Sequence, residues 1–419
     1  MIKSFIKKIK ILVVMLAFSA GVICFAGAFA YSPKVPKKVT VNGVSVGGMT
    51  RAEAARAVRK VTEDYLKDKT LKIVAGSTEY KFAYPEIYYK DDVYSVLKNA
   101  QSGKSYKAET RYYLCGMEEI ASWICLNESS SAVEPYAKFS SYGVPFEYFE
   151  GNDGREPDRA KLIEDTANSL NGGFEDVVLK FKTVNRKTTL ESVKQKTRLL
   201  SSFTTKFDGG NLNRASNIRL AASKINGCVL TSGKTLSFNN IVGARVKERG
   251  FLSAKIIENG EFTEGVGGGV CQVSTTLYNA ALLSGLEIEE YHPHSLAVSY
   301  VPPSRDAMVS GKACDLKIKN TGETPVYIRA HTTNGSVTFD IYGKSDGAVY
   351  SLDSSVTGNI PAEEETTDDP AKERAGKDGV LSEGYLKITR GGTTKSVRIR
   401  KDKYLPVKKR VYTEIEAQG

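Results

Sequence analysis

The stretch GVGGGVCQVSTTLYNAALLSG, residues 265–285, joins a glycine-rich turn to a run with helical composition, and Cys271 stands where the two meet. The residues after this cysteine predict a helix at 272–284. A helix N-terminus presents unpaired backbone N–H groups and a partial positive charge, so a thiol placed there ionises more easily. Cys271 is therefore either a small apolar residue in a tight turn or a nucleophile at a helix N-terminus.

The glycines before Cys271 suit the second interpretation. Backbone N–H groups at a helix start can hold the oxyanion of a tetrahedral intermediate. Gly268 and Gly269 carry no side chain, so we expect them to let a substrate backbone approach the thiol closely. The spacing is compatible with acyl transfer through a cysteine, although one cysteine after glycines leaves the packing alternative open.

A nucleophilic cysteine needs a base, and the chain has three histidines. His292 and His294 straddle Pro293, which favours an extended backbone. Residues two apart in an extended chain face the same side, so both imidazoles are predicted to point toward one site. The alternatives are two surface histidines or a metal site. An H-x-H pair without a clear third ligand is weak support for zinc, and we predict neither metal nor cofactor.

The net charge of +11 does not indicate a nucleic-acid partner. Residues 1–38 contain seven lysines and no acid, which leaves +4 on the remaining 381 residues. A nearly balanced folded part gives little electrostatic reason to bind nucleic acid.

The lysines instead flank ILVVMLAFSAGVICFAGAFA, residues 11–30, a run of 20 uncharged and mostly apolar residues. Such a run is long enough to span a bilayer as a helix. The preceding lysines predict a cytoplasmic N-terminus, a single-pass anchor and an extracellular remainder that faces the cell wall. The ending AFA also resembles a signal-peptide cleavage site, but the apolar run is longer than usual, so we favour an uncleaved anchor.

Cys24 lies in this apolar run, and five cysteines lie outside it, an odd number that cannot pair completely within one chain. Cys115 with Cys125, and Cys228 with Cys314, are conceivable pairs. We favour buried small apolar residues over disulfides at these four positions, with Cys271 as the free thiol.

The predicted fold class is α+β, with antiparallel strands in the part that contains Cys271. Thr50 and Glu53 have the spacing of a capping box and predict the start of an amphipathic helix. The hairpin that ends the chain turns at Gly391–Gly392, is too short to be stable alone and is expected to pack on another part. The predicted organisation is a cytoplasmic tip and anchor at 1–31, a linker at 32–38, a small α+β region at 39–192, a mixed α+β domain at 197–343, a charged linker at 348–380 and the hairpin at 381–419.

The blocks GGGVCQVSTTLYNA and HPHSLAVSYVPPSRDA, with the segments around them, closely resemble the VanW domain family over about 197–343. Residues 39–192 resemble the peptidoglycan-binding region that commonly precedes this domain, and residues 384–415 resemble a G5-like hairpin. The resemblance implies an exported cell-wall protein whose partners are peptidoglycan stem peptides.

Some VanW-domain proteins act as L,D-transpeptidases that use a cysteine, so the resemblance places the nucleophile at Cys271 and the base at His292 or His294. An arginine is expected to hold a stem carboxylate by bidentate pairing. The substrate-binding candidates are Gly268, Gly269, Arg214, Arg245, Tyr278, Ser295 and Arg305. The alternative function is a non-catalytic peptidoglycan-binding or scaffold protein in which Cys271 is only a packed residue.

Overall fold

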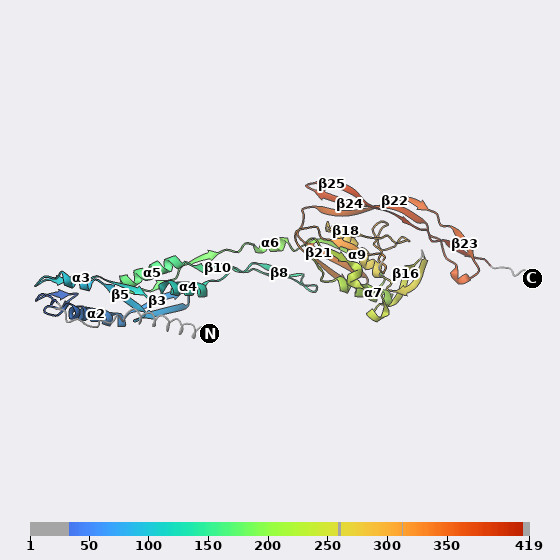
Figure 1. Cartoon of the computed structure of the whole chain (residues 1–419). Coiled ribbons are helices and arrows are strands. Elements are labelled where there is room, and N and C mark those ends of the chain that lie inside the picture. Colours follow the sequence, from blue (N-terminus) through green and yellow to red (C-terminus); the bar gives the residue numbers. More distant parts are fainter. Residues whose placement is uncertain (1–32, 259–260, 312, 414–419) are drawn as a thin grey trace, which may run out of the picture. The chain divides into compact units, whose positions relative to one another are not determined.

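The computed structural model describes residues 33–258, 261–311 and 313–413, which pack as two compact units (Figure 1). The first unit consists of residues up to 133 together with 151–187. The second consists of residues 134–150 together with those from 188 onward, and it contains Cys271.

The fold class needs one correction, which concerns the transmembrane anchor predicted at residues 11–30. These residues lie outside the described part of the chain. Within the described part, no helix is both long enough and apolar enough to cross a membrane. The fold class that the described residues support is mixed α+β with mainly antiparallel strands.

The first unit is built from short sheets covered by helices. The predicted capping box at the start of α2 is confirmed: Thr50 accepts a hydrogen bond from the backbone of Glu53, whose carboxylate accepts one from the backbone of Thr50 at 2.9 Å. Its elements are β1 (Thr40–Val41), β2 (Val44–Ser45), α2 (Arg51–Lys67), β3 (Thr70–Ala75), β4 (Thr78–Ala83), β5 (Ile87–Asp91), α3 (Val93–Lys98), β6 (Ser105–Tyr106), β7 (Thr110–Leu114), α4 (Met117–Glu128), β10 (Gly154–Pro157), α5 (Arg159–Gly172), β11 (Val177–Val178) and β12 (Phe181–Val184).

The second unit is organised around an antiparallel sheet of order β13-β21-β20-β14, on which α7 and α9 pack. The predicted helix at 272–284 is observed as α9 (Val270–Leu283), and α7 spans Leu212–Ile225. Helix α9 is buried on nearly every side, as its run of small and apolar residues allows. The sheet strands are β13 (Arg198–Lys206), β14 (Val229–Leu230), β20 (Val326–Thr332) and β21 (Ser336–Gly343).

Smaller elements complete this unit and shape the region around the start of α9. The hairpin of β16 (Ser253–Glu258) and β17 (Glu261–Val266) leads directly into the glycine-rich turn. The remaining elements before residue 320 are β8 (Tyr136–Phe139), β9 (Phe146–Phe149), α6 (Leu190–Gln195), β15 (Thr235–Ser237), α8 (Phe238–Val242), η1 (Lys247–Arg249), β18 (Glu287–Glu290) and β19 (Lys317–Lys319).

The C-terminal part forms a second antiparallel sheet, of order β22-β24-β25. Strands β24 (Gly379–Arg390) and β25 (Thr393–Tyr404) form the predicted hairpin, and Gly391 and Gly392 turn it with φ values of 54° and 83°. We call these two strands the C-terminal hairpin. Figure 1 shows it in red beside the sheet strand β22.

The segment predicted as a charged linker is largely ordered by pairing with this hairpin and with the end of the chain. Strand β22 (Val349–Ile360) runs antiparallel to β24, and β23 (Glu364–Thr367) runs parallel to β26 (Lys409–Tyr412), with η2 (Pro370–Lys372) between β23 and β24. Backbone hydrogen bonds to a neighbouring strand can order a segment that has few large apolar side chains.

Candidate active site

Cys271 is the second residue of α9, directly after a turn that only glycine can form. Gly269 caps the helix with φ of 103°, a left-handed conformation that side chains rarely adopt. A Cβ at Gly268 would lie 2.6 Å from the carbonyl oxygen of Lys255 on β16. Both glycines line the cleft described below. Neighbouring segments of the same chain already lie too close to leave room for a side chain at either position, whether or not a substrate binds.

A buried asparagine on α7 holds this turn through hydrogen bonds of its side chain. The side chain of Asn217 on α7 donates to the carbonyl oxygens of Gly268 and Leu252, at 3.0 and 2.9 Å, and accepts from the backbone N–H of Leu252 at 2.8 Å. All the hydrogen-bonding groups of this amide are used, and the residue is fully buried. The start of α9 is therefore held rigidly, which keeps the thiol in one place.

His294 contacts Cys271 and completes a triad with Asp306. The ring Nδ1 of His294 lies 2.6 Å from Oδ2 of Asp306, and the backbone N–H of His294 donates to the same oxygen at 2.8 Å. The imidazole also hydrogen bonds to the Cys271 side chain. Since Nδ1 is engaged by the carboxylate, Nε2 is the atom that faces the sulfur. A cysteine, a histidine and an acid in this order match the arrangement of a nucleophile, its base and the group that orients the base.

Hydrogen bonds and neighbouring charges favour the ionised form of this pair against the effect of burial. Burial by itself would raise the pKa of the Cys271 thiol, but the hydrogen bond and positive charge of His294, together with Arg245, outweigh it and lower the pKa below its usual value. Burial opposes the charged form of His294 too, yet Asp306 and Cys271 raise its pKa to about 9. Both shifts favour the thiolate and the imidazolium, the form in which a cysteine is nucleophilic.

The other described cysteines differ from Cys271. All five cysteines in the described part of the chain are free thiols, so neither conceivable disulfide is formed there. Burial raises the pKa of Cys125, Cys228 and Cys314. Cys271 differs from these three because its histidine partner, His294, shifts its pKa downward.

His292 has a different environment from His294. Its Nε2 lies 3.0 Å from Oε1 of Glu290, and one third of its side chain is exposed. Lys317 and His292 together lower the pKa of Glu290 to about 2, so this carboxylate is ionised. Within the described residues, His292 is not among those that line the cleft, whereas His294 is. The sequence pattern treats the two histidines alike, and the structure separates them.

A cleft of about 1390 Å³ opens at Cys271. Its walls come from the glycine turn, the β16–β17 hairpin, the start of α7 and the segment after His294, including Tyr300. Burial and the charge of Cys271 keep the pKa of Tyr300 well above its usual value, so it is a neutral phenol beside the sulfur. The cleft has room for a peptide of several residues.

Two of the three arginines expected to bind substrate line this cleft. Arg214 donates to Oε1 of Gln272 at 2.8 Å, and Arg245 donates to Oδ1 of Asn239 at 2.5 Å. Both are partly buried, and their partners are neutral amides. Arg305 lies elsewhere: it stacks over the ring of Phe203 and donates to Asn279.

The remaining two candidates also lie away from the cleft lining. Tyr278 is only 2% exposed and packs near Tyr291 and Arg400 in the interior. Ser295 follows His294, and its carbonyl oxygen accepts a hydrogen bond from the backbone of Leu405 at 2.7 Å.

Sequence reasoning did not assign a role to Asp306, Asn217 or Gln272. An acid twelve residues after His294, inside the block VPPSRDA, is a usable signal for Asp306. No local signal marks Asn217, and Gln272 is recognised only by its contacts with Arg214 and the backbone of Lys206.

Comparison with known proteins places the triad inside a recognised domain. The family model described as VanW like protein matches residues 213–342. The chain is 43% identical over 146 residues to the uncharacterized protein YoaR of Bacillus subtilis (strain 168), which covers 35% of this chain and 48% of the relative. It is 32% identical over 113 residues to the vancomycin B-type resistance protein VanW of Enterococcus faecalis (strain ATCC 700802 / V583), over 26% of this chain and 41% of the relative.

The chain thus spans less than half the length of either relative, and none of the solved structures matches it. The peptidoglycan-binding-like region predicted at 39–192 remains a prediction. The matched region contains Cys271, His294 and Asp306 together with the glycine turn and both cleft arginines. Residues 213–342 of this chain are therefore a VanW-like domain.

Proposed function

We propose that this protein is a cysteine L,D-transpeptidase that cross-links peptidoglycan stem peptides outside the cytoplasm, facing the cell wall. The VanW-like domain supports a cell-wall-related role. The observation that carries the catalytic part of the proposal is the buried triad of Cys271, His294 and Asp306 at the start of α9. A scaffold protein, the alternative considered from the sequence, would have no use for a cysteine that is hydrogen bonded to a histidine which an acid orients.

In the first step, the Cys271 thiolate attacks the carbonyl carbon of the L-centre residue in a donor stem peptide. The C–N bond to the terminal D-amino acid breaks, and the His294 imidazolium gives its proton to the leaving amine. Asp306 stabilises the imidazolium before this transfer and holds the ring in place. The products are a thioester on Cys271 and a free D-amino acid.

The oxyanion that forms during the attack needs nearby donors. The N-terminus of α9 supplies the positive end of the helix dipole and the backbone N–H of Cys271, whereas the N–H groups of Val270 and Gln272 already donate to Gly267 and Gly269. Gly268 and Gly269 leave the approach to these groups free of side chains.

In the second step, an amine from a neighbouring stem peptide attacks the thioester. The now neutral His294 takes a proton from this amine, the C–S bond breaks, and the thiolate and imidazolium are restored. Water in place of the amine would give hydrolysis. Arg214 and Arg245 are suited to hold a stem carboxylate, because they are cations in the cleft whose named partners are neutral amides.

The test is incubation of the purified protein with disaccharide-tetrapeptide fragments of peptidoglycan, followed by mass spectrometry. The expected products are a 3–3 cross-linked dimer and, early in the reaction, an acyl adduct on the peptide that contains Cys271. Cys271→Ala should abolish both, and Cys228→Ala, which alters a partly buried thiol of the same domain, should abolish neither. A folded Cys271→Ala variant that still forms the dimer would refute the proposal.

A further inference from the structure

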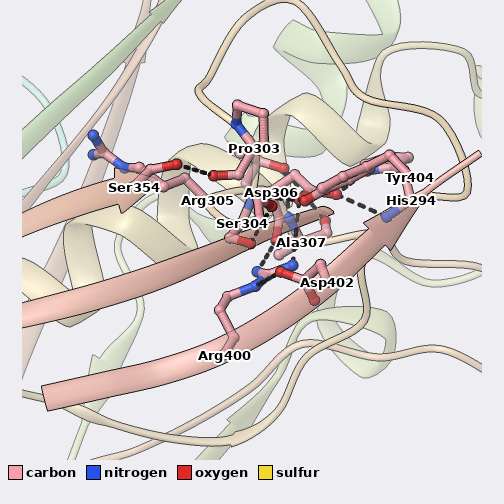
Figure 2. A network of polar contacts seen from close by, with 12 residues as sticks. His294, Pro303, Ser304, Arg305, Asp306, Ala307, Ser354, Arg400, Asp402 and Tyr404 are labelled. Carbon is pink, nitrogen blue, oxygen red and sulfur yellow. Dashed lines mark hydrogen bonds and ion pairs between the residues drawn. The ribbon is translucent and has the colours of Figure 1, made fainter. Parts of the chain in front are cut away.

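The acid of the triad is held from two sides, and one side comes from the C-terminal hairpin. Oδ2 of Asp306 accepts the two hydrogen bonds from His294 described above. Oδ1 accepts a hydrogen bond from the hydroxyl of Tyr404 at 2.5 Å and one from Nη2 of Arg400 at 3.3 Å. Figure 2 shows these side chains converging on Asp306 from the strand β25. Both residues of β25 lie beyond the VanW-like domain at 213–342.

Arg400 is anchored at every part of its guanidinium. Besides the contact with the carboxylate, its Nη1 donates to the carbonyl oxygen of Asp306 and its Nε donates to Asp402, both at 2.5 Å. The guanidinium group lies over the ring of Tyr291, and its central carbon is 4.6 Å from the ring centroid. The side chain is fully buried. A planar group with this many fixed contacts can hold its partner in one orientation.

Tyr404 is fixed as well. Its side chain is among the largest fully buried ones, and its hydroxyl accepts a hydrogen bond from the backbone N–H of Ser304 at 2.7 Å while donating to Asp306. The hydroxyl therefore joins the backbone two residues before the acid to the acid itself. A neighbouring contact between the side chains of Ser304 and Ser382, at 2.6 Å, adds a bond from β24 to the same segment.

The charges around Asp306 require such partners. Asp306 and Asp402 are two buried carboxylates, and the cations that face them are Arg400 and the imidazolium of His294. A buried carboxylate without a cation or hydrogen-bond donors takes up a proton instead of staying ionised. Burial acts in that direction at Asp306, but His294, Arg400 and Tyr404 keep its pKa below the usual value. A protonated Asp306 could not stabilise the imidazolium.

We propose that Arg400 and Tyr404 are positioning residues, which hold Asp306 ionised and aimed at His294 and thereby maintain the reactive thiolate of Cys271. The active site then extends beyond the VanW-like domain and is complete only with the C-terminal hairpin. This inference rests on the proposed function only in treating Cys271 as the nucleophile, and its effect is measurable on the thiol itself.

The test measures the rate at which iodoacetamide alkylates Cys271 as a function of pH, with the labelled peptide identified by mass spectrometry. This rate follows the thiolate fraction. The charged and titratable groups that interact with the sulfur include His294, Arg214, Arg245, Tyr300 and Cys314, and they are unchanged in the variants. Tyr404→Phe removes one oxygen atom and keeps the buried ring.

We expect Tyr404→Phe to slow alkylation at pH 7 about tenfold, the effect of losing one hydrogen bond to a charged group. The pH at which the alkylation rate reaches half its maximum should rise toward the value for an ordinary thiol. Tyr385→Phe is the matched control, because this tyrosine donates to Glu383 on the same hairpin and should titrate like the unmodified protein. Arg400→Lys should slow alkylation in the same way as Tyr404→Phe. Its control is Arg398→Lys, because Arg398 pairs with Glu383 and does not contact Asp306 in the contacts described above.

An Asp306→Asn background separates positioning from general destabilisation. If Tyr404 acts through Asp306, adding Tyr404→Phe to Asp306→Asn should not slow alkylation further. A folded Tyr404→Phe variant that titrates like the unmodified protein overturns the inference, even if cross-linked dimers form. If the titration shifts as expected but the unmodified protein never forms a cross-linked dimer, the positioning role stands and the proposed function fails.

Discussion

The carbonyl oxygen of Asp306 lies 2.5 Å from Nη1 of Arg400, 94 residues further along the chain. The same arginine reaches the Asp306 carboxylate, whose other oxygen holds His294. A chain of direct contacts therefore runs from β25 through the acid and the imidazole to the sulfur of Cys271. The consequences for reactivity and stability are testable at each link.

The two histidines should differ sharply on substitution. His294→Ala removes the base of the triad and should lower the rate of transpeptidation by roughly 10²–10⁴-fold, the usual loss for a general base. His292→Ala breaks a partly exposed contact with Glu290 and should change the rate far less. Steady-state rates of dimer formation give the comparison. Equal losses in two folded variants would contradict the assignment of His294 as the base.

The pH dependence of the first chemical step should be bell-shaped. The thiolate of Cys271 forms as the pH rises through a value below the usual thiol pKa, and this sets the acidic limb. The imidazolium of His294 is lost as the pH rises through about 9, and this sets the alkaline limb, because the leaving amine then receives no proton. Single-turnover acylation, followed by mass spectrometry from pH 4 to about 10, measures both limbs. An acidic limb at the pH of an ordinary thiol would count against a preformed ion pair.

Arg214 should determine the preference for a free carboxylate on the donor. Arg214→Gln removes one positive charge from the cleft and should lower the preference for a donor with a free carboxylate over its amide about tenfold or more, the typical effect of one charged hydrogen bond. The ratio of kcat/KM values for the two donors is the measurement. Arg305→Gln is the control, since this arginine stacks on Phe203 away from the cleft lining. An unchanged ratio in Arg214→Gln would exclude Arg214 as the carboxylate ligand.

Gly268→Ala should destabilise the domain. Its Cβ would lie 2.6 Å from the backbone oxygen of Lys255, so the turn or β16 must shift, at a cost of about 1–3 kcal/mol in the free energy of unfolding. Gly358→Ala is the matched control in the same unit, because its Cβ would meet Leu381 at an ordinary distance of 3.4 Å. Chemical denaturation of both variants tests this. Two equal unfolding free energies would mean that the turn accommodates a side chain.

Local sequence signals were sufficient for some of the helices and turns and for the position of Cys271 at a helix start. The capping box at Thr50, the helix that follows Cys271 and the turn at Gly391–Gly392 depend on residues close together in the chain, and the structure confirms each of them. The position of Cys271 at a helix start follows from the same local pattern. Such features are set by backbone propensity and capping, which a sequence displays directly.

The partners of the nucleophile depended on contacts that no local pattern encodes. His292 and His294 are equivalent in the H-P-H pattern, and contacts distant in sequence distinguish them, such as the hydrogen bonds that the Asp306 carboxylate accepts from the ring and backbone of His294. Arg400 and Tyr404 lie in a polar, alternating strand where nothing marks them as buried. Their role appears only when β25 packs beside the segment that carries Asp306.

The origin of Arg400 and Tyr404 in β25 constrains how chains of this kind can be rearranged by recombination. A breakpoint between β21 and β22 would transfer the whole VanW-like domain, with its cysteine, histidine and acid. It would leave behind β25, whose side chains donate hydrogen bonds to the acid. A breakpoint after Tyr404 would carry the complete site. Domain shuffling that preserves activity is therefore expected to move the sheet β13-β21-β20-β14 and the sheet β22-β24-β25 as one inherited block.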